Sequence, residues 1–273
     1  MVETVSKFNS YLRDFRGLTP ATVEQYTKVA RWYEAYCKVN EASRETRGAV
    51  LGFIDSRVSS TTYKRWAINI LKSYFVFLGI AWPLSRKEVP KPSPPKQPRL
   101  TMEEAAMMLK KLRHPRDRAI LRVLMVTGMR SGELCGLKRS DFKPPHLYLE
   151  LEKTGGKAVR LLDKETVSTV QQYLKVRKDK IPYLFLSSTG IKLYPQLLGY
   201  MFKKYCRIGG VEEKSPHSSR RGVASMLYDE GLGLKEIQDF VGWKRIETAA
   251  RYIKLRPEAV AKRGLEVNPL VRE

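Results

Sequence analysis

Cysteine is scarce in this chain of 273 residues, and that scarcity excludes several kinds of chemistry. Its three cysteines, Cys37, Cys135 and Cys206, are too few and too scattered for a disulfide framework or a CxxC metal site. We therefore expect neither zinc nor redox chemistry, and no cofactor.

Long hydrophobic runs are also missing. No stretch of eighteen or more apolar residues occurs, so no membrane-spanning helix is expected. The first stretch, MVETVSKFNSYLRDF, is amphipathic and mixed in charge, unlike a signal peptide. We expect a soluble, cytoplasmic protein, and a hydrophobic content of 42% is enough to build the cores of one large or two smaller domains.

Acidic residues are few relative to basic ones. There are 51 Lys and Arg residues against 28 Asp and Glu, a formal net charge of +23. Such an excess predicts a polyanionic partner that is bound through phosphate contacts. An anionic membrane surface is the alternative, but the basic residues run through the whole chain rather than forming one anchor beside an apolar segment. Nucleic acid is the favoured partner.

Proline, in contrast, is concentrated in one stretch. AWPLSRKEVPKPSPPKQPRLT, residues 81–101, holds six of the fifteen prolines and can neither continue a helix nor pair centrally in a sheet. We interpret residues 83–98 as an extended basic linker between a domain at 1–82 and a domain at 99–273. The basic residues of this linker and Arg99, which follows it directly, are expected to contact the phosphate backbone of a nucleic acid. They are Arg86, Lys87, Lys91, Lys96 and Arg99.

Residues 1–82 show helical patterns only. In LTPATVEQYTKVARWYEAYC, Thr19 suits an N-cap with Pro20 at the first helical position. In TTYKRWAINILKSYFVFLG, aromatic residues recur on one face and Gly79 suits the C-terminal cap. With VSKFNSYLRDFRG and RETRGAVLGFIDSR, about four helices are expected, and their aromatic stripes are interpreted as core. This half resembles a binding module.

After the linker, the pattern is mixed. LTMEEAAMMLKKL and RDRAILRVLMVTG have helical periodicity, and HLYLELEKTGGKAVRLL alternates around a Thr-Gly-Gly turn, which is typical of a hairpin. YLFLS is a candidate for one more strand, and helices return from LYPQLLGYMFKKYC onward. The expected fold class is mainly α with a small antiparallel sheet: an all-helical first domain and an α+β second domain.

One candidate anion site lies in KSPHSSRRGVASMLYDEG. Ser215 suits an N-cap and Pro216 the first turn of a helix, which places His217 and Arg220 near its positive end. Arg220 projects about 60° from the centre of the apolar stripe, whereas Arg221 points to the opposite side. Arg220 is therefore expected to point inward, toward either a phosphate or a structural carboxylate.

A second candidate is Arg130 in VTGMRSGELCGLK. It follows a break that contains glycine, and Glu133, three residues later, is a natural partner to orient it. The pair is compatible with a helix-capping ion pair or with a functional site.

The hairpin supplies a lysine. Leu147, Leu149 and Leu151 share one face, and counting by two places Lys153 on that face just before the turn. The ammonium group of such a lysine can be shielded from solvent and protonate a leaving group, or the side chain can simply extend into solvent. Lys157, across the turn, is the rival candidate.

The last candidate residue is Tyr252, in the stretch VGWKRIETAARYIK. On a helix, Ile246, Ala249, Ala250 and Ile253 form a buried stripe and Tyr252 lies on its flank. That position suits a packing residue as well as a reactive one.

Taken in order, TGMRSGEL, EKTGGK, PHSSR and VGWKRIETAARY resemble the tyrosine recombinases, a family of site-specific DNA integrases and Xer-like resolvases. The resemblance covers residues 99 to about 256. The module at 1–82 is similar to that family's helical, SAM-like core-binding domain only in size, position and character.

The resemblance implies roles for individual residues. The catalytic set would be Arg130, Lys153, His217, Arg220, Trp243 and the nucleophile Tyr252, with Glu133 in support. Trp243 stands where many members have histidine and some have tryptophan. An indole donates one N–H bond but cannot shuttle protons. Further DNA contacts are expected from Lys157, Arg221 and Lys244.

The resemblance also implies the reaction. Tyr252 would form a 3′-phosphotyrosyl link to double-stranded DNA without ATP or a metal ion, and four subunits would assemble on DNA. The tail KRGLEVNPLVRE is a candidate for docking on a neighbouring subunit, and equally for fraying or for packing on its own domain. Two alternatives stay open. One is a non-catalytic helix-turn-helix protein, since LGLKEIQDFVGWKRIETAARYIK suits that motif. The other is a type IB topoisomerase, which shares the covalent chemistry.

Overall fold

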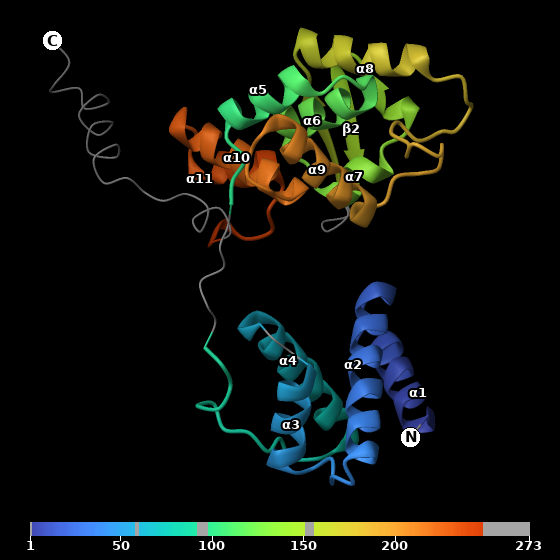
Figure 1. The fold of residues 1–273 in the computed structure, drawn as a ribbon, viewed down its shortest axis with the longest axis vertical. Helices are drawn as coiled ribbons and strands as arrows, with labels where there is room; N and C mark the ends of the chain where they lie inside the picture. The colour runs from blue at the N-terminus through green and yellow to red at the C-terminus, as the bar shows by residue number, and fades with distance from the viewer. Residues whose placement is uncertain (1, 58–59, 92–97, 151–155, 248–273) are drawn as a thin grey trace, which may run out of the picture. The chain divides into compact units, whose positions relative to one another are not determined.

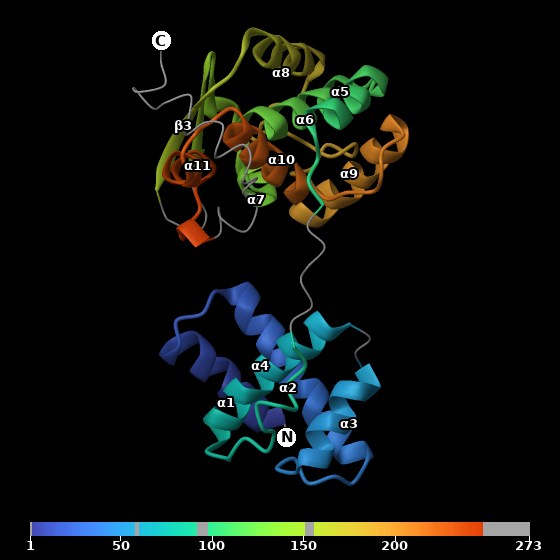
Figure 2. The ribbon, with the colours of Figure 1, turned by 90° about the vertical axis from the view of Figure 1, so that its left-hand side faces the viewer.

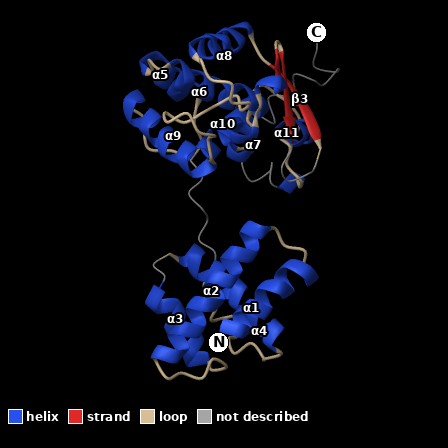
Figure 3. Ribbon diagram, turned by 90° about the vertical axis from the view of Figure 1, so that its right-hand side faces the viewer, coloured by secondary structure: helices blue, strands red, loops and turns tan. Residues whose placement is uncertain are grey.

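The chain forms two compact units, residues 1–96 and 97–273, each with its own hydrophobic core. The computed structural model describes residues 2–57, 60–91, 98–150 and 156–247. Within these ranges helices dominate and the strands form a three-stranded antiparallel sheet (Figure 3). The predicted fold class, mainly α with a small antiparallel sheet, is confirmed.

The first unit is a helical bundle (Figure 1). Aromatic rings fill its centre: Tyr33, Phe53 and Tyr74 are buried, and Tyr33 meets Phe53 edge to face at 5.3 Å. The predicted core role of the aromatic stripes holds for these rings. The helices are α1 Val2–Ser10, continued by the π-helical turn Tyr11–Phe15, α2 Pro20–Val39, α3 Arg47–Arg57 and α4 Thr61–Leu78.

Local sequence explains where two of these helices begin and end. The Thr19 hydroxyl accepts a hydrogen bond from the backbone N–H of Thr22, and Pro20 opens α2, as expected. Gly79 ends α4 with φ 69°, in the left-handed region that glycine enters without steric cost.

The start of the expected linker differs from the prediction. Leu84 is 6% exposed and belongs to the core of the helical unit, and Arg65 donates a hydrogen bond to the carbonyl oxygen of Pro90. Arg47 forms an ion pair with Glu88. Proline blocks regular secondary structure, but it does not prevent an irregular segment from packing on helices. Residues 83–90 therefore belong to the helical unit.

The second unit contains all the other helices and strands that the structure describes. Helix α6 packs against α8 and α10, and α5 packs against α9. The predicted helices at the start of this unit and between residues 195 and 241 are confirmed, whereas α8 was not anticipated. The elements are α5 Met102–Lys111, α6 Pro115–Thr127, α7 Ser131–Gly136, a 3-10 turn Arg139–Asp141, β1 Phe142–Lys143, β2 His146–Glu150, β3 Lys157–Leu161, α8 Lys164–Val176, α9 Pro195–Gly209, α10 Pro216–Asp229 and α11 Leu234–Val241.

The sheet has the strand order β1-β2-β3, and the predicted hairpin is present. Its register pairs Leu147 with Arg160 and Glu150 with Lys157. Leu147 and Leu149 are buried, as the alternation predicts. Because directly opposed residues of antiparallel strands share a face, Arg160 lies on the same inward face as these leucines.

YLFLS is not a strand of this sheet, which corrects the prediction. Leu184, Phe185 and Leu186 are all buried, so the segment has no solvent-facing side. Its backbone makes only isolated bridges, Lys138 with Tyr183 and Leu186 with Lys192. A short apolar run that is buried on all sides cannot be distinguished from a strand by its pattern alone.

Candidate functional site

Arg130 lies at the turn between α6 and α7. Helix α6 ends at Thr127, Gly128 adopts φ 60°, and Arg130 becomes the N-cap of α7. Its backbone N–H donates to Glu133 Oε2 at 2.7 Å and its Nη1 to Oε1 at 2.6 Å. Glu133 is 5% exposed, so one buried carboxylate holds both the backbone and the guanidinium of Arg130.

Arg220 comes from α10 and is among the most buried side chains of the described chain, 1% exposed. Its Nη1 donates to the carbonyl oxygen of Gly128 at 2.8 Å, next to the turn that holds Arg130. Arg221 is half-buried, and its Nη1 lies 3.4 Å from the carbonyl oxygen of Pro98. The structure therefore confirms that Arg220 is the arginine that points inward.

The two arginines converge on the end of α11. The carbonyl oxygen of Gly242 accepts a hydrogen bond from Arg130 Nη2 at 2.6 Å and a longer one from Arg220 Nη2 at 3.5 Å. Gly242 caps α11 with φ 73°, a conformation that favours glycine. Three separate segments, at the starts of α7 and α10 and the end of α11, thus meet at one point (Figure 2).

Trp243 follows directly and is 8% exposed. It packs in a small cluster with Ala224, Ile237 and Val241, and the Arg220 guanidinium lies 5.6 Å from the centre of its ring. A cation over an indole face is attracted by the ring quadrupole. The indole thus joins α10 to α11 and borders the arginine pair.

His217 occupies the first turn of α10, and its side chain is exposed. Ser215 is the N-cap and Pro216 the first helical residue, as predicted. Since α10 begins here, the positive end of its dipole lies beside His217.

Two of the predicted catalytic residues, Lys153 and Tyr252, lie outside the described residues. The rival Lys157 is exposed at the start of β3. Ile246, expected in a buried stripe beside Tyr252, is 42% exposed, so that expectation is wrong at this position.

The predicted DNA contacts that the structure describes fall into two groups. Arg99 and Arg221 form hydrogen bonds within the protein. Arg99 Nη1 donates to the hydroxyl of Ser225, and Arg221 Nη1 to the carbonyl oxygen of Pro98. Lys96 lies outside the described residues. The others are exposed, namely Arg86, Lys87, Lys91, Lys157 and Lys244.

Sequence patterns missed two contributors to this site. A carbonyl oxygen such as that of Gly242 has no side-chain signature. The other is Arg160, which donates to the carbonyl oxygen of Phe240, two residues before Gly242. The sequence did contain a signal for Arg160. The alternating pattern of the hairpin places it on the apolar face, where an arginine is unusual and indicates a specific contact.

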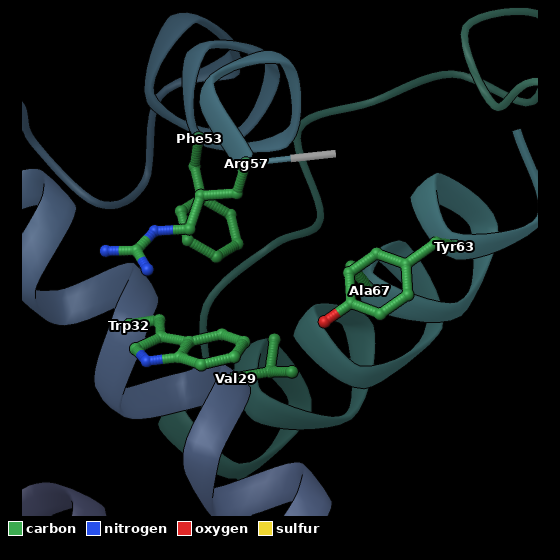
Figure 4. A pocket seen from close by; sticks show the side chains of 6 residues that line it. All are labelled: Val29, Trp32, Phe53, Arg57, Tyr63 and Ala67. Carbon is green, nitrogen blue, oxygen red and sulfur yellow. The ribbon is translucent and has the colours of Figure 1, made fainter. Parts of the chain in front are cut away.

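A different hollow, of about 140 Å³, lies in the helical unit among α2, α3 and α4 (Figure 4). Arg57 and Lys28 lie 5.2 and 4.9 Å from the centre of the Trp32 ring. The residues proposed for catalysis are absent from its lining, which consists of Val29, Trp32, Phe53, Arg57, Tyr63 and Ala67.

In the part of the chain that the structure describes, no group of three or more His, Cys, Asp or Glu side chains lies together where it could hold a metal ion. In the same part, no helix is both long and apolar enough to cross a bilayer.

Comparison with known proteins agrees with this geometry. The chain is 29% identical to the tyrosine recombinase XerA of Pyrococcus horikoshii over 93% of its own length and 89% of that protein. It is 25% identical to the tyrosine recombinase XerD of Listeria monocytogenes over 96% and 98%.

Among solved structures, a lambda integrase tetramer bound to a Holliday junction matches with a TM-score of 0.75 at 18% identity, over 93% of this chain and 77% of that one. A XerA recombinase crystal structure matches with a TM-score of 0.56 at 22% identity, over 98% and 99%. Residues 98–259 match the phage integrase family. The chain belongs to the phage integrase family, the family of the tyrosine recombinases.

Proposed function

We propose that this tyrosine site-specific recombinase cuts and rejoins double-stranded DNA through a covalent bond between Tyr252 and a 3′-phosphate. The observation that supports the proposal best is the convergence of Arg130 and Arg220 on one carbonyl oxygen. Glu133 balances one of these two charges. A phosphate accepts hydrogen bonds from two planar guanidinium groups, so it can bind both arginines at once.

In this mechanism the two arginines hold the non-bridging oxygens of the scissile phosphate. The Tyr252 oxygen attacks phosphorus, the bond between phosphorus and the 5′-oxygen breaks, and a hairpin lysine, Lys153, protonates the departing oxygen. Phenols titrate near pH 10, so the cationic surroundings must favour the phenolate. His217, beside the start of α10, orients groups or accepts the phenol proton.

The bond energy is conserved in the phosphotyrosyl link, so a 5′-hydroxyl from a second strand can reverse the step without ATP. The arginines take the charge-stabilising role that metal ions have in other phosphoryl-transfer enzymes. Trp243, next to Arg220, packs under the reacting groups and offers one N–H donor.

Trapping a covalent adduct tests the proposal. The protein is incubated with a nicked suicide substrate that carries its site, found by mapping covalently bound DNA ends across the source genome. The wild type should form an adduct, Tyr252→Phe should form none, and Tyr228→Phe in α10 is the matched control that should react normally. An adduct with the Tyr252→Phe variant would show that the nucleophile is wrongly assigned.

The same assay separates the alternatives. Binding of nicked target DNA without any cleavage would favour the helix-turn-helix hypothesis. Relaxation of supercoiled DNA by monomers, without a defined site, would favour the type IB topoisomerase hypothesis.

We further propose that four copies assemble on two duplexes, that the enzyme acts in the cytoplasm, and that residues after Gly264 dock on a neighbouring subunit. Deleting those residues should weaken assembly on DNA and spare binding to a single site. Unchanged assembly would contradict the docking role.

A further inference from the structure

Arg160 connects the β-hairpin to the end of α11. Its Nη2 donates to the carbonyl oxygen of Phe240, and its guanidinium lies 4.8 Å from the centre of the Phe240 ring. Its Nη1 donates to the carbonyl oxygen of Val159 at 3.1 Å. A cation at the last turn of a helix also meets the negative end of the dipole. One side chain thus joins a strand to a helix end.

That helix end is part of the candidate site. Two residues after Phe240, Gly242 presents the carbonyl oxygen that Arg130 and Arg220 share. Arg160 also lies close enough to Glu133 for their charges to interact: burial lowers the pKa of Arg160, and the carboxylate of Glu133 opposes that effect. Arg160 therefore lies beside the arginine pair.

The other connection runs along the hairpin. Arg160 pairs with Leu147 and shares the inward face with Leu149. The segment between β2 and β3 contains Lys153, which lies outside the described residues. Whatever fixes β3 against α11 also fixes Lys157, the first residue of β3, relative to Gly242.

An arginine is energetically unfavourable where only a packing contact is needed. A buried guanidinium loses hydration, and an apolar side chain of similar volume often packs there with equal or greater stability. A directional bond to one carbonyl oxygen, in contrast, sets the relative position of two elements.

We propose that Arg160 is a positioning residue: it holds the β2–β3 hairpin against the end of α11 so that the hairpin lysine reaches the oxygen that leaves the phosphate. The inference rests on the proposed function, because it needs a lysine that acts as the acid. It assigns no contact between Arg160 and DNA.

The test compares two leaving groups at the scissile position of the suicide substrate. In the first substrate the bridging atom is the natural 5′-oxygen, and in the second it is sulfur. A thiolate is far less basic than an alkoxide and leaves without being protonated, so a defect in the acid disappears on the sulfur substrate. Lys153→Ala and Lys157→Ala are measured first. The acid is the lysine whose alanine variant is slow on the oxygen substrate and recovers its cleavage rate on the sulfur substrate.

Arg160→Ala should then behave like the loss of that lysine. General acid catalysis contributes roughly 10²–10⁴-fold, and we expect the variant to cleave the oxygen substrate at least ~10-fold more slowly than wild type. On the sulfur substrate it should come within a few-fold of wild type. Arg160→Lys, which keeps the positive charge and one donor nitrogen, should be intermediate on the oxygen substrate.

Arg118→Ala is the matched control. Arg118 is also a half-buried arginine that donates to carbonyl oxygens at a helix end, those of Leu109 at 3.0 Å and Leu112 at 3.4 Å, but it contacts α5. It should cleave both substrates like wild type. Arg160→Met preserves the side-chain volume and replaces Arg160→Ala if the alanine variant does not fold.

Two results would overturn the inference: a variant at position 160 that cleaves the oxygen substrate at the wild-type rate, or one equally slow on both substrates. The second result indicates a general structural role. Failure of the proposed function is distinct, because then the wild type forms no adduct or Tyr252→Phe still forms one.

Discussion

Arg130 and Arg220 direct guanidinium nitrogens at the same atom, the carbonyl oxygen of Gly242, at 2.6 and 3.5 Å. Like charges so close together repel, and the carboxylate of Glu133, 2.6 Å from Arg130, offsets part of that repulsion. A bound phosphate would add negative charge beside both guanidinium groups. We therefore expect a bound phosphate to stabilise the arrangement.

Replacing Arg220 with lysine should slow cleavage strongly. Lysine keeps the charge but loses the planar fork that reaches both Gly128 and the phosphate. Loss of one well-placed donor at a developing charge costs roughly 10²–10³-fold in rate, and we expect Arg220→Lys to fall in that range in single-turnover assays. DNA binding, measured by gel shift, should change much less. Arg116→Lys, at a buried arginine outside this site, is the control, and equal rates for the two variants would contradict the assignment.

Adding a methyl group at Gly222 should displace α10. A Cβ atom there would lie 1.8 Å from the carbonyl oxygen of Leu100, which is backbone and cannot turn away. Overpacking of this kind costs about 1–3 kcal/mol, so Gly222→Ala should lower the midpoint of thermal unfolding and weaken cleavage, since Arg220 moves with the helix.

Gly199→Ala in α9 provides the contrast. A Cβ atom at Gly199 would meet no atom within 4 Å, and alanine in a helix interior is favoured over glycine by roughly 0.5–1 kcal/mol. Its unfolding midpoint should rise slightly. If both variants unfold at the same temperature, the close approach at Gly222 does not limit stability.

Substitutions at Trp243 should separate packing from hydrogen bonding. Truncating a buried aromatic residue costs about 3–5 kcal/mol, so Trp243→Ala should reduce both stability and cleavage. Trp243→Phe keeps most of the packing but has no N–H donor, and Trp243→His keeps a donor in a smaller ring. If packing dominates, alanine is the most damaging change. A phenylalanine variant as slow as alanine would instead indicate the indole N–H.

Glu88, in the segment 83–90, should make the stability of the helical unit depend on pH. Glu88 accepts a hydrogen bond from the backbone N–H of Ser85 and pairs with Arg47, and these contacts lower its pKa from 4.5 to about 2. A carboxyl group whose pKa falls on folding stabilises the fold above its unfolded value. This contribution is complete above pH 4.5 and is lost as the pH falls to about 2.

Glu88→Gln measures that contribution. The difference in urea stability between wild type and variant should stay constant above about pH 5 and shrink toward pH 2. Tryptophan fluorescence follows the helical unit, because three of the four tryptophans lie in it: Trp32, Trp66 and Trp82. A difference that does not change with pH would show that Glu88 is not engaged in solution.

Much of the fold follows from local signals in the sequence. Thr19 and Pro20 mark the start of α2, Gly79 marks the end of α4, and the alternation in HLYLE marks β2. Such features act over a few residues, so a single sequence reveals them. Helix α8 could have been found in the same way, because Asp163 caps it by accepting hydrogen bonds from the backbone N–H groups of Glu165 and Thr166.

The sequence by itself determined the types of most elements, the inward direction of Arg220 and the family to which the motifs belong. Only the tertiary structure decided that Leu84 belongs to the helical core, that YLFLS lies buried outside the sheet, and that Gly242 and Arg160 join the site. These features depend on contacts between segments distant in the chain. Periodicity reports which face of an element is buried, but it does not report which backbone oxygen that face will meet.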